Sequence, residues 1–351
     1  MFQNLHFDDH EEVVFAADAS SGLNAILAVH DTTLGPSLGG CRVWTYDSDE
    51  AALNDALRLS RAMTYKSAMA DLPLGGGKSV VMVPTRGAKT GAMFEALGKA
   101  IQRLGGRYIV AEDVGSEPSD MKAISTHTDH VTGLSVADGG LGDPSATTAD
   151  GCFIGVRATA AALGRELEGL HVAVQGLGNV GFGLAKRLHR AGARLTVADP
   201  HAPAVSRAVE ELGAKAVPVG DILTVEADIL SPNALGGVLN ERTIGALKVA
   251  AVAGAANNQL ARSEDGELLR ARGILFAPDY LVNAGGVTKM CGDYFGWESA
   301  AVTRRVEGIA DRLSAVFATA AAGSRPTNEV ADEMALEKVR AGANRLEPAP
   351  A

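Results

Sequence analysis

The sequence has few cysteines, few aromatic residues and no excess of positive charge. Its 351 residues include 3 cysteines and 5% aromatic residues, and 42 acidic against 32 basic side chains give a formal net charge of −10. The scattered Cys41, Cys152 and Cys291 lack paired C-x-x-C spacing, which argues against a disulfide framework or a zinc site. We therefore expect reduced thiols and no bound metal.

Two classes of partner are also excluded by what is missing. A negative net charge gives no general attraction to phosphate backbones or anionic membranes. No apolar run approaches the roughly 20 residues of a membrane span, and the N-terminus MFQNLHFDDHEE has neither the basic nor the apolar region of a signal peptide. We expect a cytoplasmic protein that binds neither nucleic acid nor a membrane.

The stretch LPLGGGKSVV, residues 72–81, resembles a nucleotide-binding loop but lacks its spacing. A phosphate loop needs a glycine six positions before the lysine, and that position is Leu72. The residues after Lys78, SVVMVP, are β-rich and closed by proline, so they predict a strand where a phosphate loop needs a helix. Lys78 therefore needs another explanation.

The chain is long enough for two domains with a cleft between them. Residues 13–31 read as a β-hairpin, and helices are predicted after Asp47–Asp49 and after Lys89–Thr90, followed by the strand RYIVAED. The loop-like passage 132–151 places a boundary near residue 140. We predict an α/β substrate-binding domain over residues 1–140 and a Rossmann-like doubly wound domain over 141–326, with a C-terminal helix over 327–345 packing back on the first domain. The tail after Arg345, LEPAPA, is expected to fray.

The second half opens with a dinucleotide-binding signature, VAVQGLGNVGFGLAKRLHRAGARLTVAD. Gly176, Gly178 and Gly181 match G-x-G-x-x-G after a strand and before a helix. The first glycine permits a tight turn, the second a close approach of the pyrophosphate, and the third close packing of helix on strand. Asp199 ends the next strand, where a carboxylate binds the ribose hydroxyls. Its charge would repel a 2′-phosphate, which favours NAD over NADP.

Three later strands end in small or polar residues. Asn233, Asn257 and Asn283 each lie at such an end. Ligands sit beyond the carboxyl ends of strands in doubly wound sheets, so these asparagines are candidates for holding nicotinamide, ribose or substrate. The alternative is that they are ordinary turn residues.

Lys66, Lys78 and Asp113 are all predicted at the ends of elements in the first domain. Three glycines precede Lys78 and an apolar strand follows it. Burial disfavours the charged form of a lysine, so Lys78 could lose and regain its proton and act as an acid or a base. The glycines would let a substrate or the nicotinamide approach the chain.

The sequence resembles the glutamate/leucine/phenylalanine/valine dehydrogenase family over nearly its whole length. The motifs that carry the resemblance are GPSLGGCR, MTYKSAMADLPLGGGKS, AEDVGS, GLGNVG, AGAANNQ and APDYLVNAGGV. The resemblance implies reversible oxidative deamination of an L-amino acid to a 2-oxo acid, with NAD reduced and ammonia released. It also implies a homo-oligomer.

Roles for individual residues follow from the resemblance. Lys66 would bind the substrate carboxylate, and Lys78 would activate the water that attacks the imine. Asp113 would accept the proton of the substrate ammonium, and Asn257 would hold the substrate carboxylate or the nicotinamide end. The other candidate substrate-binding residues are Leu38, Gly39, Gly40, Ala111, Val287 and Met290. The candidate cofactor-binding residues are Gly176, Gly178, Asn179, Val180, Gly181, Asp199, Asn233, Ala255, Asn257 and Asn283.

The same resemblance bears on which amino acid is used. Family members that act on glutamate carry a lysine where this chain has Leu38, so an acidic side chain would face an apolar group. Ala111 and Val287 are similar to the leucine type. The segment PLGGGKS is closer to the phenylalanine type, and the flexible Met290 could reshape the pocket in either direction. Leucine, isoleucine and valine are favoured, with phenylalanine or tryptophan as the alternative.

Two rival functions were weighed. A non-catalytic NAD-binding protein would not need Lys66, Lys78 and Asp113 together. A 2-hydroxy-acid dehydrogenase would normally need a histidine as acid and base, and no histidine lies in the motifs above.

Overall fold

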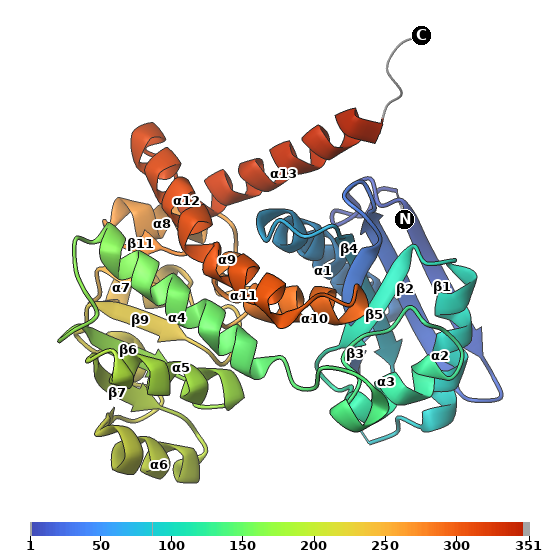
Figure 1. Ribbon diagram of the computed structural model, residues 1–351, viewed down its shortest axis with the longest axis horizontal. Helices are drawn as coiled ribbons and strands as arrows, with labels where there is room; N and C mark the ends of the chain where they lie inside the picture. The colour runs from blue at the N-terminus through green and yellow to red at the C-terminus, as the bar shows by residue number, and fades with distance from the viewer. Residues whose placement is uncertain (1, 86, 347–351) are drawn as a thin grey trace. The chain divides into compact units, whose positions relative to one another are not determined.

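The computed structural model describes residues 2–85 and 87–346, and the chain divides into two compact units (Figure 1). Unit 1 contains the chain up to Asp143, the segment Lys289–Glu298 and the chain from Ala335 on; unit 2 contains Pro144–Thr288 and Ser299–Met334. We describe each unit by itself. The assignment of substrate binding to residues 1–140 and of cofactor binding to 141–326 stays a prediction.

Unit 1 is built on a mixed five-stranded sheet in the order β1-β2-β4-β3-β5. The strands are β1 (Glu12–Asp18), β2 (Leu23–Asp31), β3 (Ser37–Trp44), β4 (Gly75–Met82) and β5 (Tyr108–Glu112). β1 and β2 form the predicted hairpin, whose turn uses Gly22 at φ 76°. β2 is antiparallel to β4, whereas β3 is parallel to both β4 and β5.

Three helices complete this unit, and capping side chains define where two of them begin. α1 (Asp49–Met69) starts after Ser48, whose side chain accepts a hydrogen bond from the Ala51 amide. α2 (Gly91–Arg103) starts after Thr90, which accepts from the Met93 amide in the same way. Both predicted helix starts are confirmed. α3 (Pro118–Ser125) and the 3₁₀ turn η1 (Val136–Asp138) follow β5.

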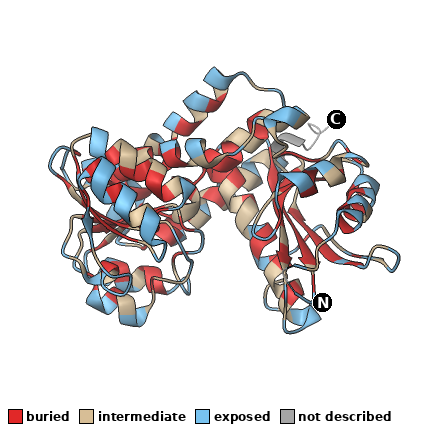
Figure 2. Ribbon diagram, turned by 90° about the horizontal axis from the view of Figure 1, so that it is seen from below, coloured by how far each residue is buried: buried red, intermediate tan, exposed pale blue. Residues whose placement is uncertain are grey.

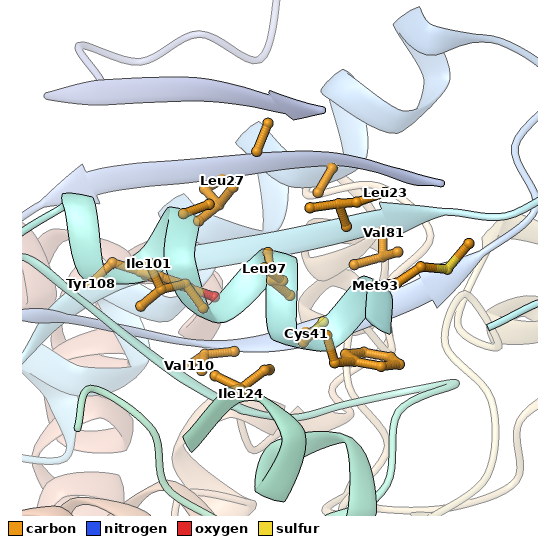
Figure 3. Packing of buried hydrophobic residues seen from close by; sticks show 14 of the residues in the cluster. Leu23, Leu27, Cys41, Val81, Met93, Leu97, Ile101, Tyr108, Val110 and Ile124 are labelled. Carbon is orange, nitrogen blue, oxygen red and sulfur yellow. The ribbon is translucent and has the colours of Figure 1, made fainter. Parts of the chain in front are cut away.

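The two faces of the sheet are buried by different helices, as the period of two along a strand requires. One face carries Leu23, Leu27, Val81 and Val110 against α2, whose side chains enter this cluster in Figure 3. The other face presents Ile26, Ala28 and Val80 to Ala52 and Ala56 of α1. The α1 face also carries the candidate catalytic residue Lys78, two residues before Val80 on β4.

The structure corrects the reading of two glycine-rich segments. The passage LGPSLGGCRVW, which was not predicted as a strand, contains β3, and β3 pairs on both edges. Lys78 lies inside β4, which begins at Gly75, and not at the start of a strand as predicted. Glycine has a low intrinsic propensity for β-strands. In these two segments, pairing with the adjacent strands outweighs that propensity.

The three glycines before Lys78 make room for protein and not for a ligand. A methyl group on Gly75 would lie 1.8 Å from the carbonyl oxygen of Asp31, and one on Gly76 would lie 2.1 Å from the amide nitrogen of Thr64 in α1. A methyl group on Gly77 would meet the Tyr108 ring at 2.6 Å. The prediction that these glycines admit substrate or nicotinamide is therefore wrong.

Unit 2 contains a six-stranded sheet in the order β11-β10-β9-β6-β7-β8, with every pairing parallel. Numbered from β6, the order is 3-2-1-4-5-6, which is that of a doubly wound dinucleotide-binding sheet. This confirms the predicted fold class. The strands are β6 (His171–Gln175), β7 (Arg194–Ala198), β8 (Lys215–Ala216), β9 (Ile229–Pro232), β10 (Ala251–Val252) and β11 (Leu275–Phe276).

The remaining elements of the chain precede, connect or follow these strands. They are α4 (Ser145–Ala162), α5 (Asn179–Arg190), α6 (Ala202–Leu212), η2 (Ile222–Thr224), α7 (Glu241–Ala246), α8 (Asp265–Ala271), α9 (Asp279–Val282), α10 (Gly285–Tyr294), α11 (Ser299–Glu307), α12 (Ile309–Gly323) and α13 (Thr327–Leu346). The end of the passage expected to be a loop, from Ser145 on, forms the first turns of α4. In both α10 and α13 the chain passes from one unit to the other within a continuous helix.

Buried residues concentrate on the strands and on the inner sides of the helices in each unit (Figure 2). Cys41, Cys152 and Cys291 are buried, and none of the three forms a disulfide bond. Over residues 2–85 and 87–346, no helix is both long and apolar enough to cross a membrane. The C-terminal tail that was expected to fray lies, from residue 347 on, outside the described residues.

A buried histidine helps to fasten α1 to the rest of unit 1. His10 is 6% exposed, its Nδ1 accepts a hydrogen bond from the Asp8 amide, and its Nε2 lies 3.1 Å from the carbonyl oxygen of Leu57. The pKa of His10 is lowered from 6.5 to about 4, mainly by burial. The charge of His30 adds to this shift, and the hydrogen bond to Leu57 opposes it. The ring is therefore neutral in the folded protein at neutral pH.

We predict that this histidine makes the protein less stable in mild acid. A folded-state pKa below the unfolded value means that unfolding takes up a proton, so stability is lost as pH falls from about 6.5 towards 4. The loss should be roughly 2–3 kcal/mol. Urea unfolding from pH 7 to 4.5 should show a shallower pH dependence for His10→Gln than for wild type. The exposed His189→Gln serves as the matched control, and equal slopes in all three proteins would contradict the assignment.

Candidate active site

A buried ion pair joins two of the predicted catalytic residues. Lys78 projects from β4 and donates a hydrogen bond through Nζ to Oδ2 of Asp113, the residue that follows β5. Lys78 is 5% exposed, and the Asp113 side chain is 21% exposed. An ion pair with so little solvent is costly to break by removing one partner, because the remaining charge stays buried.

A second cation shares the same carboxylate. The Nε of Arg42 lies 3.4 Å from Oδ2 of Asp113. Burial alone would raise the pKa of Asp113, but the charges of Lys78 and Arg42 outweigh burial and lower the pKa to about 2. Asp113 is thus an anion at neutral pH.

The alternation of side chains along the strands explains why these groups meet. Leu38, Gly40 and Arg42 are two residues apart on β3 and therefore face the same side of the sheet. Ala111 of β5 and Asp113 are likewise two apart. Gly40 must lack a side chain, because a methyl group there would lie 2.6 Å from Cβ of Asp113. This is the face that α1 covers.

A further set of polar groups on α1 and after β3 holds Arg42 in place. The Nη1 of Arg42 donates to Oδ2 of Asp55 at 2.8 Å, and the same oxygen accepts from the hydroxyl of Tyr46 at 2.7 Å. Arg58 donates to the other oxygen, Oδ1, at 2.9 Å. Sequence reasoning missed Arg42 and Asp55. The sequence position of Arg42 could have identified it, because Arg42 lies two residues after Gly40 and therefore on the same face of the strand.

The other predicted substrate-binding residues of unit 1 differ in how far they are buried. Leu38 and Ala111 are buried at 1% exposure, and Lys66 is half-buried in the last turn of α1. Gly39 has no room for a side chain, since a methyl group would lie 1.7 Å from the Gly77 carbonyl oxygen. Their contacts with a substrate stay a prediction.

Two candidates lie one helical turn apart on α10, at positions that belong to different units. Val287 is 5% exposed and counts with unit 2. Met290 is half-buried and counts with unit 1, where its carbonyl oxygen accepts from the Thr132 hydroxyl at 3.3 Å. Residues three apart on a helix share a face.

In unit 2, each glycine of the G-x-G-x-x-G turn has a different steric environment. Gly176 has φ 90°, in the region that glycine adopts without strain. A methyl group on Gly181 would lie 2.0 Å from the Gly176 carbonyl oxygen, so the helix packs directly on the turn. Outside its chain neighbours, no described atom lies within 4 Å of a methyl group built on Gly178. The space above Gly178 is open for a ligand.

Helix α5 begins at this open position with Asn179, Val180 and Gly181. Its N-cap is Gly178, which provides no side chain to cap the first amides. Such an uncapped N-terminus attracts negative charge such as a pyrophosphate. Asp199 lies at the end of β7, and its carboxylate accepts hydrogen bonds from the amides of Leu177 and His201 at 2.7 Å each. These bonds orient the carboxylate next to the glycine turn.

The predicted asparagines differ in how far the protein already satisfies them. Asn233 follows β9, the strand beside β6 at which the sheet order reverses; it donates to Ser231 and accepts from the Ala255 amide at 2.9 Å. Asn283 donates to the Ala255 carbonyl oxygen at 3.0 Å and to Oδ1 of Asn257 at 2.8 Å.

One acceptor of this group is buried without a partner. Asn283 is 4% exposed, and within the described chain its Oδ1 accepts no hydrogen bond. A buried unsatisfied oxygen costs free energy unless a ligand or water donates to it. Together with the open Gly178 and the uncapped α5, this oxygen fits a dinucleotide that ends in a carboxamide. Among the residues described, no cluster of His, Cys, Asp and Glu could hold a metal ion.

Comparison with known proteins identifies the family of the chain. A sequence model described as "Glu/Leu/Phe/Val dehydrogenase, dimerisation domain" matches residues 10–130. A second, described as "Glutamate/Leucine/Phenylalanine/Valine dehydrogenase", matches residues 139–207 and 200–346. The chain belongs to the glutamate/leucine/phenylalanine/valine dehydrogenase family. As a dehydrogenase of this family it uses a nicotinamide cofactor and acts on a small molecule.

Individual family members match over almost the whole chain. The leucine dehydrogenase of Geobacillus stearothermophilus is 49% identical over 341 residues, which cover 97% of this chain and 93% of that protein. The phenylalanine dehydrogenase of Caldalkalibacillus thermarum is 42% identical over 339 residues, covering 95% and 92%. The crystal structure of the L-tryptophan dehydrogenase from Nostoc punctiforme superposes with a TM-score of 0.85 at 37% identity, covering 96% and 97%.

Two glycine substitutions should separate cofactor binding from folding. Gly178→Ala places a methyl group in open space, so its melting temperature should stay within about 2 °C of wild type, while its affinity for a reduced nicotinamide cofactor falls at least about tenfold. Gly181→Ala should lose roughly 1–3 kcal/mol of stability through overlap with the turn. Thermal unfolding and titration of cofactor fluorescence measure both effects. Unchanged cofactor affinity in Gly178→Ala would contradict this site.

Proposed function

We propose that the protein catalyses the NAD-dependent, reversible oxidative deamination of an apolar L-amino acid, with leucine, valine and isoleucine favoured. The amino acid, water and NAD⁺ give the 2-oxo acid, ammonium, NADH and a proton. The observation that carries the proposal is the buried Lys78–Asp113 pair with Arg42 beside it, on a chain that belongs to this family.

The chain's residues supply binding and proton transfer. Lys66, in the last turn of α1, binds the substrate carboxylate. Asp113 receives the proton of the substrate ammonium, because hydride leaves Cα only when the amine is neutral. Lys78 holds the attacking water and moves its proton. The pKa of Asp113 near 2 belongs to the state in which Lys78 is charged, so the carboxylate becomes a stronger base when Lys78 is neutral.

The cofactor is NAD, which accepts the hydride from Cα when bound. Asp199 supports this choice, because two backbone amides orient its carboxylate at the end of β7. There it accepts hydrogen bonds from ribose hydroxyls and repels a 2′-phosphate. Gly178 and the start of α5 take the pyrophosphate, and Asn283 offers its unpartnered oxygen to the carboxamide.

The preference for a branched aliphatic substrate rests on two arguments. Identity is higher to the Geobacillus leucine dehydrogenase, at 49%, than to the phenylalanine dehydrogenase, at 42%. Leu38, on the same face as Gly40 and Arg42, gives no countercharge to an acidic side chain, which would be costly to desolvate there. The matching model of residues 10–130 describes a dimerisation domain, which supports a homo-oligomer.

A substrate panel tests this function. NADH formation at alkaline pH should be fastest with leucine, valine or isoleucine, slow with phenylalanine and tryptophan, and negligible with glutamate. Turnover with NADP should be lower than with NAD. If NADH formation is fastest with phenylalanine or tryptophan, the substrate pocket is larger than proposed, and Met290 is the first residue to substitute. No turnover with any amino acid would refute the proposal.

Replacing Lys78 should abolish catalysis without unfolding the protein. Lys78→Ala should lower kcat by roughly 10²–10⁴-fold, the range typical of a general acid or base. The Asp113 carboxylate keeps Arg42 as a countercharge, so the fold should survive. Steady-state kinetics at saturating leucine, with circular dichroism and NADH binding as controls, measures this. A kcat within about threefold of wild type would exclude the role.

A further inference from the structure

The two cations beside Asp113 differ in whether they can lose their charge. Lys78 is an amine whose proton can move during the reaction, whereas a guanidinium stays protonated in proteins. Burial lowers the pKa of Arg42, but the carboxylates of Asp113 and Asp55 outweigh burial and raise it above its ordinary value. Arg42 therefore provides a constant positive charge next to a variable one.

We propose that Arg42 is a positioning residue that keeps Asp113 ionised and in place while Lys78 changes its protonation state. The inference rests on the proposed function, because it assigns Lys78 and Asp113 to proton transfer. Without Arg42, a neutral Lys78 would leave a buried carboxylate with no countercharge among the contacts described. A buried carboxylate without a countercharge is readily protonated. Asp113 would then lose the ionised form that acts as the base.

The geometry around Arg42 is suited to this role. Its Nη1 is bonded to Asp55 at 2.8 Å, and its Nε points at Asp113 from 3.4 Å. That Nε is buried and makes no hydrogen bond within the part of the chain described, so its contact with Asp113 is one of charge. A planar guanidinium spans both carboxylates in a single orientation.

Asp55 acts as the fixed anchor of this arrangement. It accepts hydrogen bonds from Arg42, Tyr46 and Arg58. Burial opposes its ionisation, but the Tyr46 hydroxyl and the charge of Arg42 lower the pKa of Asp55 below its ordinary value. The charged and titratable groups that face Asp113 or Arg42 are Lys78 on β4, Cys41 on β3, Tyr46 after β3, Asp55 on α1 and Tyr108 on β5. Arg58 on α1 acts on Asp55.

The test is the pH profile of kcat/KM for wild type and Arg42→Met with leucine and NAD. Removing the constant charge lets the Lys78–Asp113 pair hold its shared proton to higher pH. The rising limb of the profile should therefore move up by about one pH unit or more. Arg42→Lys retains a cation and should keep its limb within about 0.3 unit of wild type.

Arg58→Met is the matched control for the loss of a guanidinium. Arg58 shares Asp55 with Arg42 but is bonded to the other oxygen, and its side chain is 42% exposed. The rising limb of the kcat/KM profile of Arg58→Met should stay at the wild-type pH. Should Arg42→Met fail to fold, Arg42→Gln carries the same test, because its amide can still donate to Asp55 without a charge.

A second readout does not require turnover. Acetic anhydride acetylates only the neutral amine, so peptide mass spectrometry across a pH series reports when Lys78 becomes reactive. In Arg42→Met this should occur at higher pH than in wild type, and in Arg42→Lys and Arg58→Met at the wild-type pH. Failure of wild type to oxidise any amino acid refutes the proposed function, while acetylation still decides the role of Arg42.

Two results would overturn the inference. One is an Arg42→Met protein that folds and shows the wild-type limb and the wild-type acetylation profile. The other is Arg42→Lys shifted as far as Arg42→Met, since the effect would then come from shape and not from charge.

Discussion

The candidate active site of unit 1 depends on one buried ion pair, between Lys78 and Asp113. A lysine and an aspartate removed from water attract each other strongly, but each has lost its hydration, so neither can be left alone. The sheet meets this constraint by parallel pairing. β3 lies between β4 and β5, and it brings Arg42 to the same side as Lys78 and Asp113. The carboxylate thereby has two cations, and the loss of charge on one need not protonate it.

Under the proposed function, unit 2 meets a different constraint, which is to accommodate the pyrophosphate of a dinucleotide without bulky side chains next to it. The backbone performs most of this task. The sheet order reverses between β6 and β9, and the glycine turn and Asn233 follow these two strands. The only strongly charged side chain in the predicted set is Asp199, which is held by two amides next to the turn. In the proposed function, the charge of Asp199 discriminates against a 2′-phosphate and does not provide general attraction.

Much of the fold was predictable because its signals are local. Ser48 and Thr90 mark the starts of α1 and α2, and Gly176, Gly178 and Gly181 have separate steric roles that the motif itself specifies. β3 was missed because glycine is unfavourable in an isolated strand, whereas pairing on both edges stabilises it. The bond between Arg42 and Asp55 was missed for a related reason. It joins a strand to a helix, and no spacing along the chain encodes that contact.

The glycine run before Lys78 limits which positions near the candidate active site can be altered by protein engineering. Asp31, Thr64 and Tyr108 occupy the space next to the three glycines, so any side chain introduced there would separate β4 from β2, α1 or β5. A library that randomises these positions to widen substrate scope would yield mostly misfolded proteins.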